Sequence, residues 1–156
     1  MNPCPCGYLG DVEQRCRCTP EQVQRYRARL SGPLLDRIDL HLQVRREPTR
    51  LHAASEGPDS AALAQQVAAA QQRQLDRQGC ANAHLDLPSL RQHCPLGDAD
   101  RLWLESAGER LRLSLRALHR VLKVARTLAD LEGREQIERA QLAEALQYRA
   151  PGEGPA

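Results

Sequence analysis

The stretch that decides the fold is SLRALHRVLKVARTLADLEG, residues 114–133. Apolar side chains recur in it every three or four positions, which is the period of one face of an α-helix. That face consists of Leu118, Val121, Leu122, Ala125, Leu128 and Ala129. Ser114 is a preferred N-cap residue, and Gly133 is a preferred residue just after a helix. The stretch therefore predicts a long amphipathic helix that packs against other helices.

Further helices are expected on both sides of it. A helix capped by Asp59 or Ser60 is predicted to end at Gly79, with an inward face of Leu63, Val67 and Leu75. A short helix over residues 88–94, another from residue 98 and a last one over 139–148 follow. Residues 59–150 are thus expected to form a bundle of about five helices. Residues 151–156 are expected to be a disordered tail.

The first third of the chain has a mixed pattern. Thr19 followed by Pro20 and Gln22 predicts a capping box and a helix to about residue 30, and Pro33 opens a second, short helix. Leu40, Leu42 and Val44 then alternate with polar residues, as in a half-buried strand. A single strand needs a sheet, and the sequence supplies no other strand. The expected fold is therefore mainly α: residues 1–45 a helix-plus-strand fragment, 46–58 a linker and 59–150 the bundle.

Composition narrows the class of protein. Apolar residues make up 41% of the 156 residues, aromatic residues 3%, and Phe is absent, so the core must be built from aliphatic side chains. The net charge of +2 argues neither for nor against a nucleic-acid partner. No apolar run reaches the length of a membrane span, and no secretory signal is visible. We expect a cytoplasmic protein without a membrane partner.

Four of the six cysteines lie in the first eighteen residues, as two C-x-C pairs. Cys4, Cys6, Cys16 and Cys18 match the four soft ligands of a tetrahedral structural zinc site, although the usual spacing is C-x2-C or longer. The alternative is a loop with free thiols or with disulfides formed on oxidation. The remaining two, Cys80 and Cys94, are expected to be small buried residues.

Several arginines are candidates for contacting phosphate. Arg37 lies where the short helix meets the predicted strand, and it can either pair with Asp36 or Asp39 or reach a phosphate group. Arg116, with Arg120 and Lys123, forms a stripe that is either solvated or faces an anion. A further set on the first helix and before it can touch a nucleic-acid backbone: Arg15, Arg17, Arg25, Arg27 and Arg29. The chain contains no G-x4-G-K-[ST] loop, so it lacks a phosphate cradle of its own.

Several motifs in this order resemble one family. They are MNPCPCGY at residues 1–8, CRC at 16–18, SGPLLDRIDL at 31–40, LKVARTLADL at 122–131 and EALQYR at 144–149. Together they look like the signatures of the ComM-type, magnesium-chelatase-like AAA+ ATPases. The resemblance extends over nearly the whole chain, apart from residues 45–60 and the tail.

The resemblance implies a role for individual residues. The chain would be the C-terminal part of a hexameric ATPase, running from the end of the ATPase core through the helical lid. Asn2 matches the sensor-1 residue that positions the attacking water, and Arg37 matches the arginine finger directed at a neighbouring subunit's ATP. Arg116 matches the sensor-2 arginine, acting in its own subunit or on a neighbour's nucleotide. ATP with Mg²⁺ would be the cofactor of the longer protein.

The family also implies an activity. ComM-type members are helicases that promote DNA branch migration in natural transformation, whereas their chelatase relatives drive metal insertion into porphyrin. Without Walker motifs, these 156 residues are not expected to hydrolyse ATP alone. Two alternatives remain at this point: a subunit of a chelatase-like motor, and a self-standing zinc module that binds nucleic acid or protein.

Overall fold

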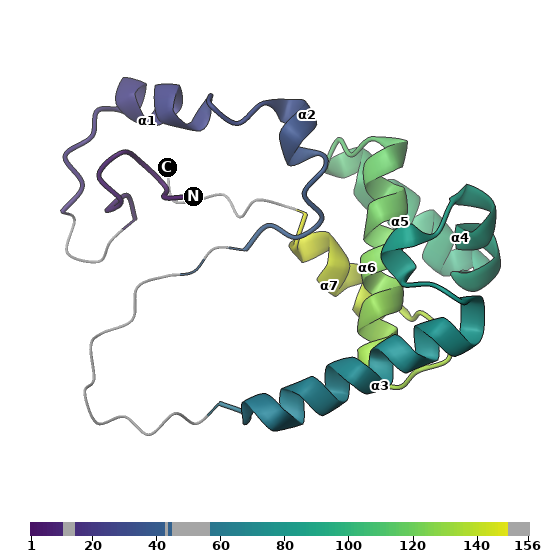
Figure 1. The fold of residues 1–156 in the computed structure, drawn as a ribbon. Helices are drawn as coiled ribbons and strands as arrows, with labels where there is room; N and C mark the ends of the chain where they lie inside the picture. The colour runs from purple at the N-terminus through teal and green to yellow at the C-terminus, as the bar shows by residue number, and fades with distance from the viewer. Residues whose placement is uncertain (11–14, 43, 45–56, 150–156) are drawn as a thin grey trace. The chain divides into compact units, whose positions relative to one another are not determined.

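The computed structural model describes residues 1–10, 15–42, 44 and 57–149. The chain divides into two compact units, Met1–Ala53 and Ala54–Ala150, which are described separately below as unit 1 and unit 2. Across the described residues there are seven α-helices and one 3-10 turn, so the predicted mainly helical fold is confirmed (Figure 1). Most of the predicted linker and the whole predicted tail lie outside the described residues.

Unit 2 contains the predicted helical bundle. Its elements are α3 (Ser60–Gln78), the 3-10 turn η1 (Asn82–His84), α4 (Leu87–His93), α5 (Asp98–Arg110), α6 (Leu115–Leu131) and α7 (Arg139–Gln147). Local signals set the helix ends. The Ser114 Oγ accepts a hydrogen bond from the Ala117 amide at 3.1 Å, and Gly79 and Gly133 adopt the left-handed conformation after α3 and α6.

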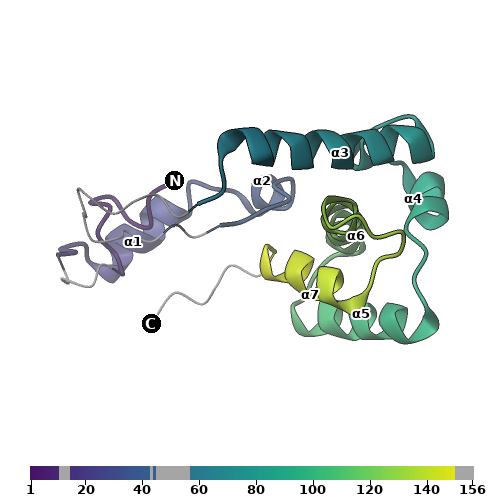
Figure 2. The ribbon, with the colours of Figure 1, turned by 90° about the horizontal axis from the view of Figure 1, so that it is seen from below.

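Helix α6 lies at the centre of unit 2. It contacts α7, α3, α4 and η1, and Figures 1 and 2 show it running between α3 on one side and α7 on the other. Its buried face carries four small residues at intervals of four: Ala117, Val121, Ala125 and Ala129. On α5, Gly108 lies so close to α6 that an added Cβ would be 2.8 Å from a methyl carbon of Leu118. The predicted apolar face of this helix is therefore confirmed as the core.

Helix α3 faces α6 differently from the prediction. Leu63, Val67 and Leu75 are 45%, 57% and 42% exposed, so their predicted inward orientation is wrong. The buried residues of α3 are instead Ala70 and Gln74. The helix is rotated in this way because polar side chains near its C-terminal end bond to buried polar groups of α6, described below.

Unit 1 contains two short helices, α1 (Pro20–Arg27) and α2 (Gly32–Leu35). The predicted capping box is confirmed: the Gln22 amide donates to Thr19 Oγ1 at 3.3 Å, and the Thr19 amide donates to Gln22 Oε1 at 3.0 Å. Ser31 caps α2 by accepting from the Leu34 amide at 3.3 Å. Each helix thus begins where its local sequence signal predicts.

The predicted strand is not present in the described part of residues 40–44. Leu40, Leu42 and Val44 are 49%, 70% and 92% exposed, and their backbone has no regular secondary structure. The physical reason is that a strand is stable only as part of a sheet, and the described residues contain no second strand for it to pair with.

In the part of the chain that the structure describes, no helix combines the length and the apolar character needed to cross a membrane.

Candidate metal centre and arginine sites

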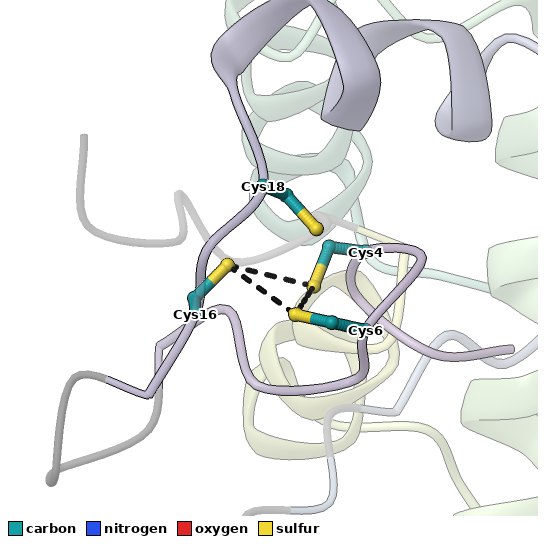
Figure 3. Close-up of side chains that lie close together, drawn as sticks. All are labelled: Cys4, Cys6, Cys16 and Cys18. Atoms are coloured by element: carbon teal, nitrogen blue, oxygen red, sulfur yellow. Dashed lines mark hydrogen bonds between the residues drawn. The ribbon is translucent and has the colours of Figure 1, made fainter.

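The four cysteines near the N-terminus converge in unit 1. Their sulfur atoms all lie within 4.8 Å of one another, with Cys4 Sγ 3.3 Å from Cys6 Sγ and 3.7 Å from Cys16 Sγ (Figure 3). A tight turn makes this possible, because Gly7 has a φ of 84° and its amide donates to the Cys4 carbonyl at 3.1 Å. The spacing-based prediction that the two pairs meet agrees with this geometry.

The sulfur positions fit a zinc ion. Tetrahedral ligands about 2.3 Å from a zinc ion lie about 3.8 Å from each other. The contacts of 3.3 and 3.7 Å are close to that edge length. Thiolates are the soft ligands that zinc prefers, and Cys4 is fully buried, so the site has a protected side. The donor set and its spacing therefore suit a structural zinc site.

Hydrogen bonds and neighbouring sulfurs shift the pKa values of these thiols in opposite directions. The pKa of Cys6 is lowered to about 6, chiefly by a hydrogen bond from the Tyr8 amide and then by one from the Cys4 thiol. The Cys18 sulfur receives a hydrogen bond from the Cys6 amide, which lowers its pKa. The neighbouring Cys6 sulfur, burial and Cys4 outweigh that effect and raise it to about 12. The pKa of Cys16 is also raised, since burial and the Cys6 and Cys4 sulfurs outweigh the hydrogen bond from the Cys18 amide.

The other two cysteines belong to unit 2. Cys94 is buried in the core, and this burial raises the pKa of its thiol to about 11. Cys80 is half-buried and packs against the same core. Cys94 is therefore the small buried residue that was predicted, whereas Cys80 is only partly buried.

Asn2 and Arg37, the two predicted catalytic residues, are both exposed residues of unit 1. Asn2 lies beside the cysteine loop, where its side-chain nitrogen is 3.6 Å from the place of a Cβ on Gly7. Arg37 lies in the turn after α2, and its amide donates to the Leu34 carbonyl at 3.0 Å. Their assignment to ATP hydrolysis stays a prediction.

Arg116, the predicted nucleotide contact, is exposed in the first turn of α6 in unit 2. The rest of its stripe is less exposed. Arg120 is half-buried, and Lys123 donates to the Ala83 carbonyl at 2.9 Å, which joins α6 to η1. The stripe thus has two parts along α6. Arg116 at the start of the helix is exposed, whereas Lys123 holds η1 against α6.

Unit 2 also contains a buried ionic network that was not predicted from the sequence. Asp130 is fully buried, and Arg77 of α3 binds both its oxygens at 2.6 and 2.9 Å. Arg126, 1% exposed, lies 3.0 Å from the same carboxylate and donates to the carbonyls of Glu135 and Arg134 at 2.7 and 2.6 Å. The Asn82 side chain donates to Asp130 at 2.8 Å. The network joins α3, η1, α6 and the α6–α7 loop.

A sequence signal for this network exists. Arg126 and Asp130 continue the row that begins with Leu118 and Leu122 at intervals of four on the inward side of α6. Two opposite charges at i and i+4 in an apolar row indicate a buried ion pair, because a buried charge must be paired. The partner Arg77 on another helix has no comparable signal.

The chain combines a cysteine-rich segment with exposed arginines and a helical bundle. Both parts match known protein families. Residues 57–149 match the family described as "Magnesium chelatase, subunit ChlI C-terminal", and residues 1–51 match "Magnesium chelatase, subunit ChlI". The chain therefore belongs to the magnesium-chelatase-like family of AAA+ proteins, and the predicted family resemblance is confirmed.

Individual relatives agree with this assignment. The chain is 48% identical to the uncharacterized protein YifB of Escherichia coli and 43% identical to the competence protein ComM of Haemophilus influenzae. It is 38% identical to the uncharacterized protein Mb2921c of Mycobacterium bovis. The alignments cover 96%, 96% and 97% of this chain but only 30% of each relative. The chain thus spans about a third of the length of the curated relatives that it matches.

Proposed function

We propose that this chain is the sensor and lid portion of a hexameric AAA+ ATPase that moves DNA branches during natural transformation. The observation that carries the proposal is the match of residues 57–149 to the chelatase C-terminal family, on a helical bundle that presents Arg116 at its surface. A relative named as a competence protein supports the choice of natural transformation.

In this proposal the chain supplies groups that act on ATP held elsewhere. Arg37 and Arg116 carry exposed guanidinium groups, which suit phosphate oxygens, but no phosphate-binding loop occurs in the sequence. Bound ATP with Mg²⁺ supplies the phosphoryl group that is transferred to water. Arg37 stabilises the charge that develops on that group in the neighbouring subunit, an effect worth about 10³-fold or more in rate. Asn2 orients the attacking water, and Arg116 contacts the nucleotide.

The test is Arg37→Ala in the full-length protein. ATP binding is expected to stay largely intact while hydrolysis collapses, because the lost contact belongs to the transition state. Mixing this variant with a subunit that lacks the Walker lysine is expected to restore part of the activity, since an intact arginine then faces an intact phosphate loop. Near-normal turnover of Arg37→Ala would remove Arg37 from the site, and robust ATPase activity of the 156-residue chain would overturn the whole assignment.

We also propose that Cys4, Cys6, Cys16 and Cys18 hold one structural zinc ion. The support is that all four sulfurs lie within 4.8 Å of one another and that those of Cys4, Cys6 and Cys16 are 3.3–3.7 Å apart. The purified chain is expected to carry about one zinc per molecule, and Cys4→Ser/Cys16→Ser is expected to lose it. Cys80→Ser is the matched control, because Cys80 lies in unit 2. A metal-free chain whose loop keeps this structure would contradict the proposal.

A further inference from the structure

Positive charge is concentrated next to the cysteine cluster. Residues 15–29 contain five of the 22 basic residues of the chain but only one of its 20 acidic residues, Glu21. All five arginines are exposed: Arg15, Arg17, Arg25, Arg27 and Arg29. We call this set the basic surface of unit 1. The net charge of the whole chain does not reveal this surface, because acidic residues outnumber basic ones in the rest of the sequence.

The cysteine loop and helix α1 are joined where these arginines lie. Arg27 of α1 donates to the Pro3 carbonyl at 3.3 Å, directly before Cys4. Arg17 stands between Cys16 and Cys18, and its amide bonds to the Cys6 sulfur. An ion on the four sulfurs would therefore fix the backbone that carries Arg15 and Arg17, and the Arg27 contact would hold α1 against it.

Two arginines are further ordered by aromatic rings. The Arg15 guanidinium lies 4.6 Å from the ring centre of Tyr8, and that of Arg29 lies 5.7 Å from the ring centre of Tyr26. Stacking of this kind restricts a long side chain, and the guanidinium carries its N–H groups at the edge of its plane. Such groups bind the paired oxygens of a phosphate in a defined orientation.

We infer that the basic surface of unit 1 binds the phosphate backbone of a nucleic acid and that the cysteine-bound zinc orders it for this purpose. The inference rests on the proposed function, since it assigns a surface to the proposed DNA partner. Five exposed arginines within residues 15–29 match a polymer with a charge at every nucleotide. Helix α1 itself offers an anionic membrane no exposed apolar face, because its apolar side chains Val23 and Tyr26 are half-buried, so a membrane is the poorer match for the arginines of α1.

The experiment compares two charge-matched double variants of the full 156-residue chain. Arg17→Gln/Arg25→Gln removes two charges from the basic surface, and Arg91→Gln/Arg110→Gln removes two exposed charges from unit 2. Fluorescence anisotropy measures their affinity for labelled oligothymidine and for a duplex of equal length, at several salt concentrations. The first variant is expected to bind about tenfold more weakly, with the salt dependence reduced by about one unit per arginine. The control variant is expected to bind as the unchanged chain does.

Zinc content, measured on every sample, separates this inference from its competitors. If the arginines only balance the charge of the thiolates, Arg17→Gln/Arg25→Gln loses zinc, and the inference is overturned. Equal affinity of the two double variants, or binding of the unchanged chain to phosphatidylserine vesicles and not to oligonucleotides, also overturns it. Chelation of zinc is expected to weaken nucleic-acid binding, and added zinc to restore it. The proposed ATPase role is tested separately, since near-normal ATP turnover of full-length Arg37→Ala would contradict that role and would not affect the nucleic-acid inference.

Discussion

The two units of the chain are stabilised in opposite ways. Unit 2 buries a continuous aliphatic core around α6 together with a charged network that is satisfied on several sides. In the described residues of unit 1, Cys4 alone is buried, while Leu34, Ile38 and Leu40 are 45%, 40% and 49% exposed. A unit without a core must gain stability from a metal, a partner or another part of a protein. We therefore expect unit 2 to be stable through its own packing and unit 1 to depend on what it binds.

The largest expected effect comes from removing zinc. Structural zinc contributes about 10–16 kcal/mol to the folding of zinc-finger peptides, so chelation is expected to abolish the structure of the cysteine loop. Unit 2 is expected to stay folded, because its core contains no part of the metal centre. Hydrogen exchange with mass spectrometry would show faster exchange in residues 1–30 and unchanged protection in 115–131. Equal loss of protection in both regions would show that the units depend on each other.

Breaking the buried network should be the most damaging single change in unit 2. Asp130→Ala leaves the buried Arg126 guanidinium without its carboxylate and is expected to lower the unfolding free energy by about 3–5 kcal/mol. Asp98→Ala removes an exposed pair with Arg101 and should cost about 1 kcal/mol or less. Urea denaturation followed by circular dichroism measures both. Similar losses for the two variants would mean that the network contributes little beyond a surface ion pair.

Acid should weaken unit 2 through the same carboxylate. Burial raises the pKa of Asp130, but the hydrogen bonds from Arg77 and Asn82 and the charge of Arg126 outweigh it and lower the pKa. A lowered folded-state pKa means that the stabilisation is complete above the unfolded value of about 3.9 and is lost as the pH falls through the folded value. Urea midpoints measured from pH 6 to pH 2 should therefore fall less steeply in Asp130→Asn.

Part of that slope will remain, since the pKa of Asp86 is also lowered by its hydrogen bonds with Ser89. An acid dependence identical in Asp130→Asn and the unchanged chain would exclude Asp130 as a source of acid sensitivity.

The two helix caps offer a smaller and more selective test. Ser114→Ala and Thr19→Ala each remove a side-chain cap, a change that typically costs about 1 kcal/mol. The first should lower the thermal midpoint of unit 2. The second should leave that midpoint unchanged and loosen α1 only, as seen by exchange of the Val23 amide. A shift of the unit 2 midpoint in Thr19→Ala would show that α1 stabilises the bundle.

Leu42→Ala should have the smallest effect, within about 0.5 kcal/mol, because the Leu42 side chain is 70% exposed. Leu142→Ala is the contrasting change, since Leu142 is fully buried in the core and its truncation should cost about 2–5 kcal/mol. Thermal unfolding of both variants measures the difference. A large loss in Leu42→Ala would reveal a contact of unit 1 that its exposure hides.

Local signals made much of the fold predictable. The capping box at Thr19, the cap at Ser114 and the stops at Gly79 and Gly133 act within a few residues, so they can be read without knowing the rest of the structure. The orientation of α3 could not be predicted in this way. Its inward side is set by Arg77, which donates to Asp130, and by Gln74, which accepts from the Asn82 amide, and such pairings depend on the tertiary fold.

The candidate sites show the same division. The two C-x-C pairs predicted a cluster because a short loop brings them together, and the sulfurs do converge. The strand over residues 40–44 was predicted only from the alternation of apolar and polar residues. That alternation does not show whether other strands are present to form a sheet. The roles of Arg37, Asn2 and Arg116 concern groups outside this chain, so neither the sequence pattern nor the described residues of a single chain decide them.

The small residues on the buried face of α6 tolerate replacement by other small residues but not by larger ones. The distance between packed helices depends on the side chains at their contact, and here Ala117, Ala125 and Ala129 contribute one methyl group each. A larger side chain at these positions would force neighbouring helices apart, as a methyl group on Gly108 would displace Leu118. Natural variation at these three positions should therefore run between glycine, alanine and serine, while the exposed side of α3 is free to change in size.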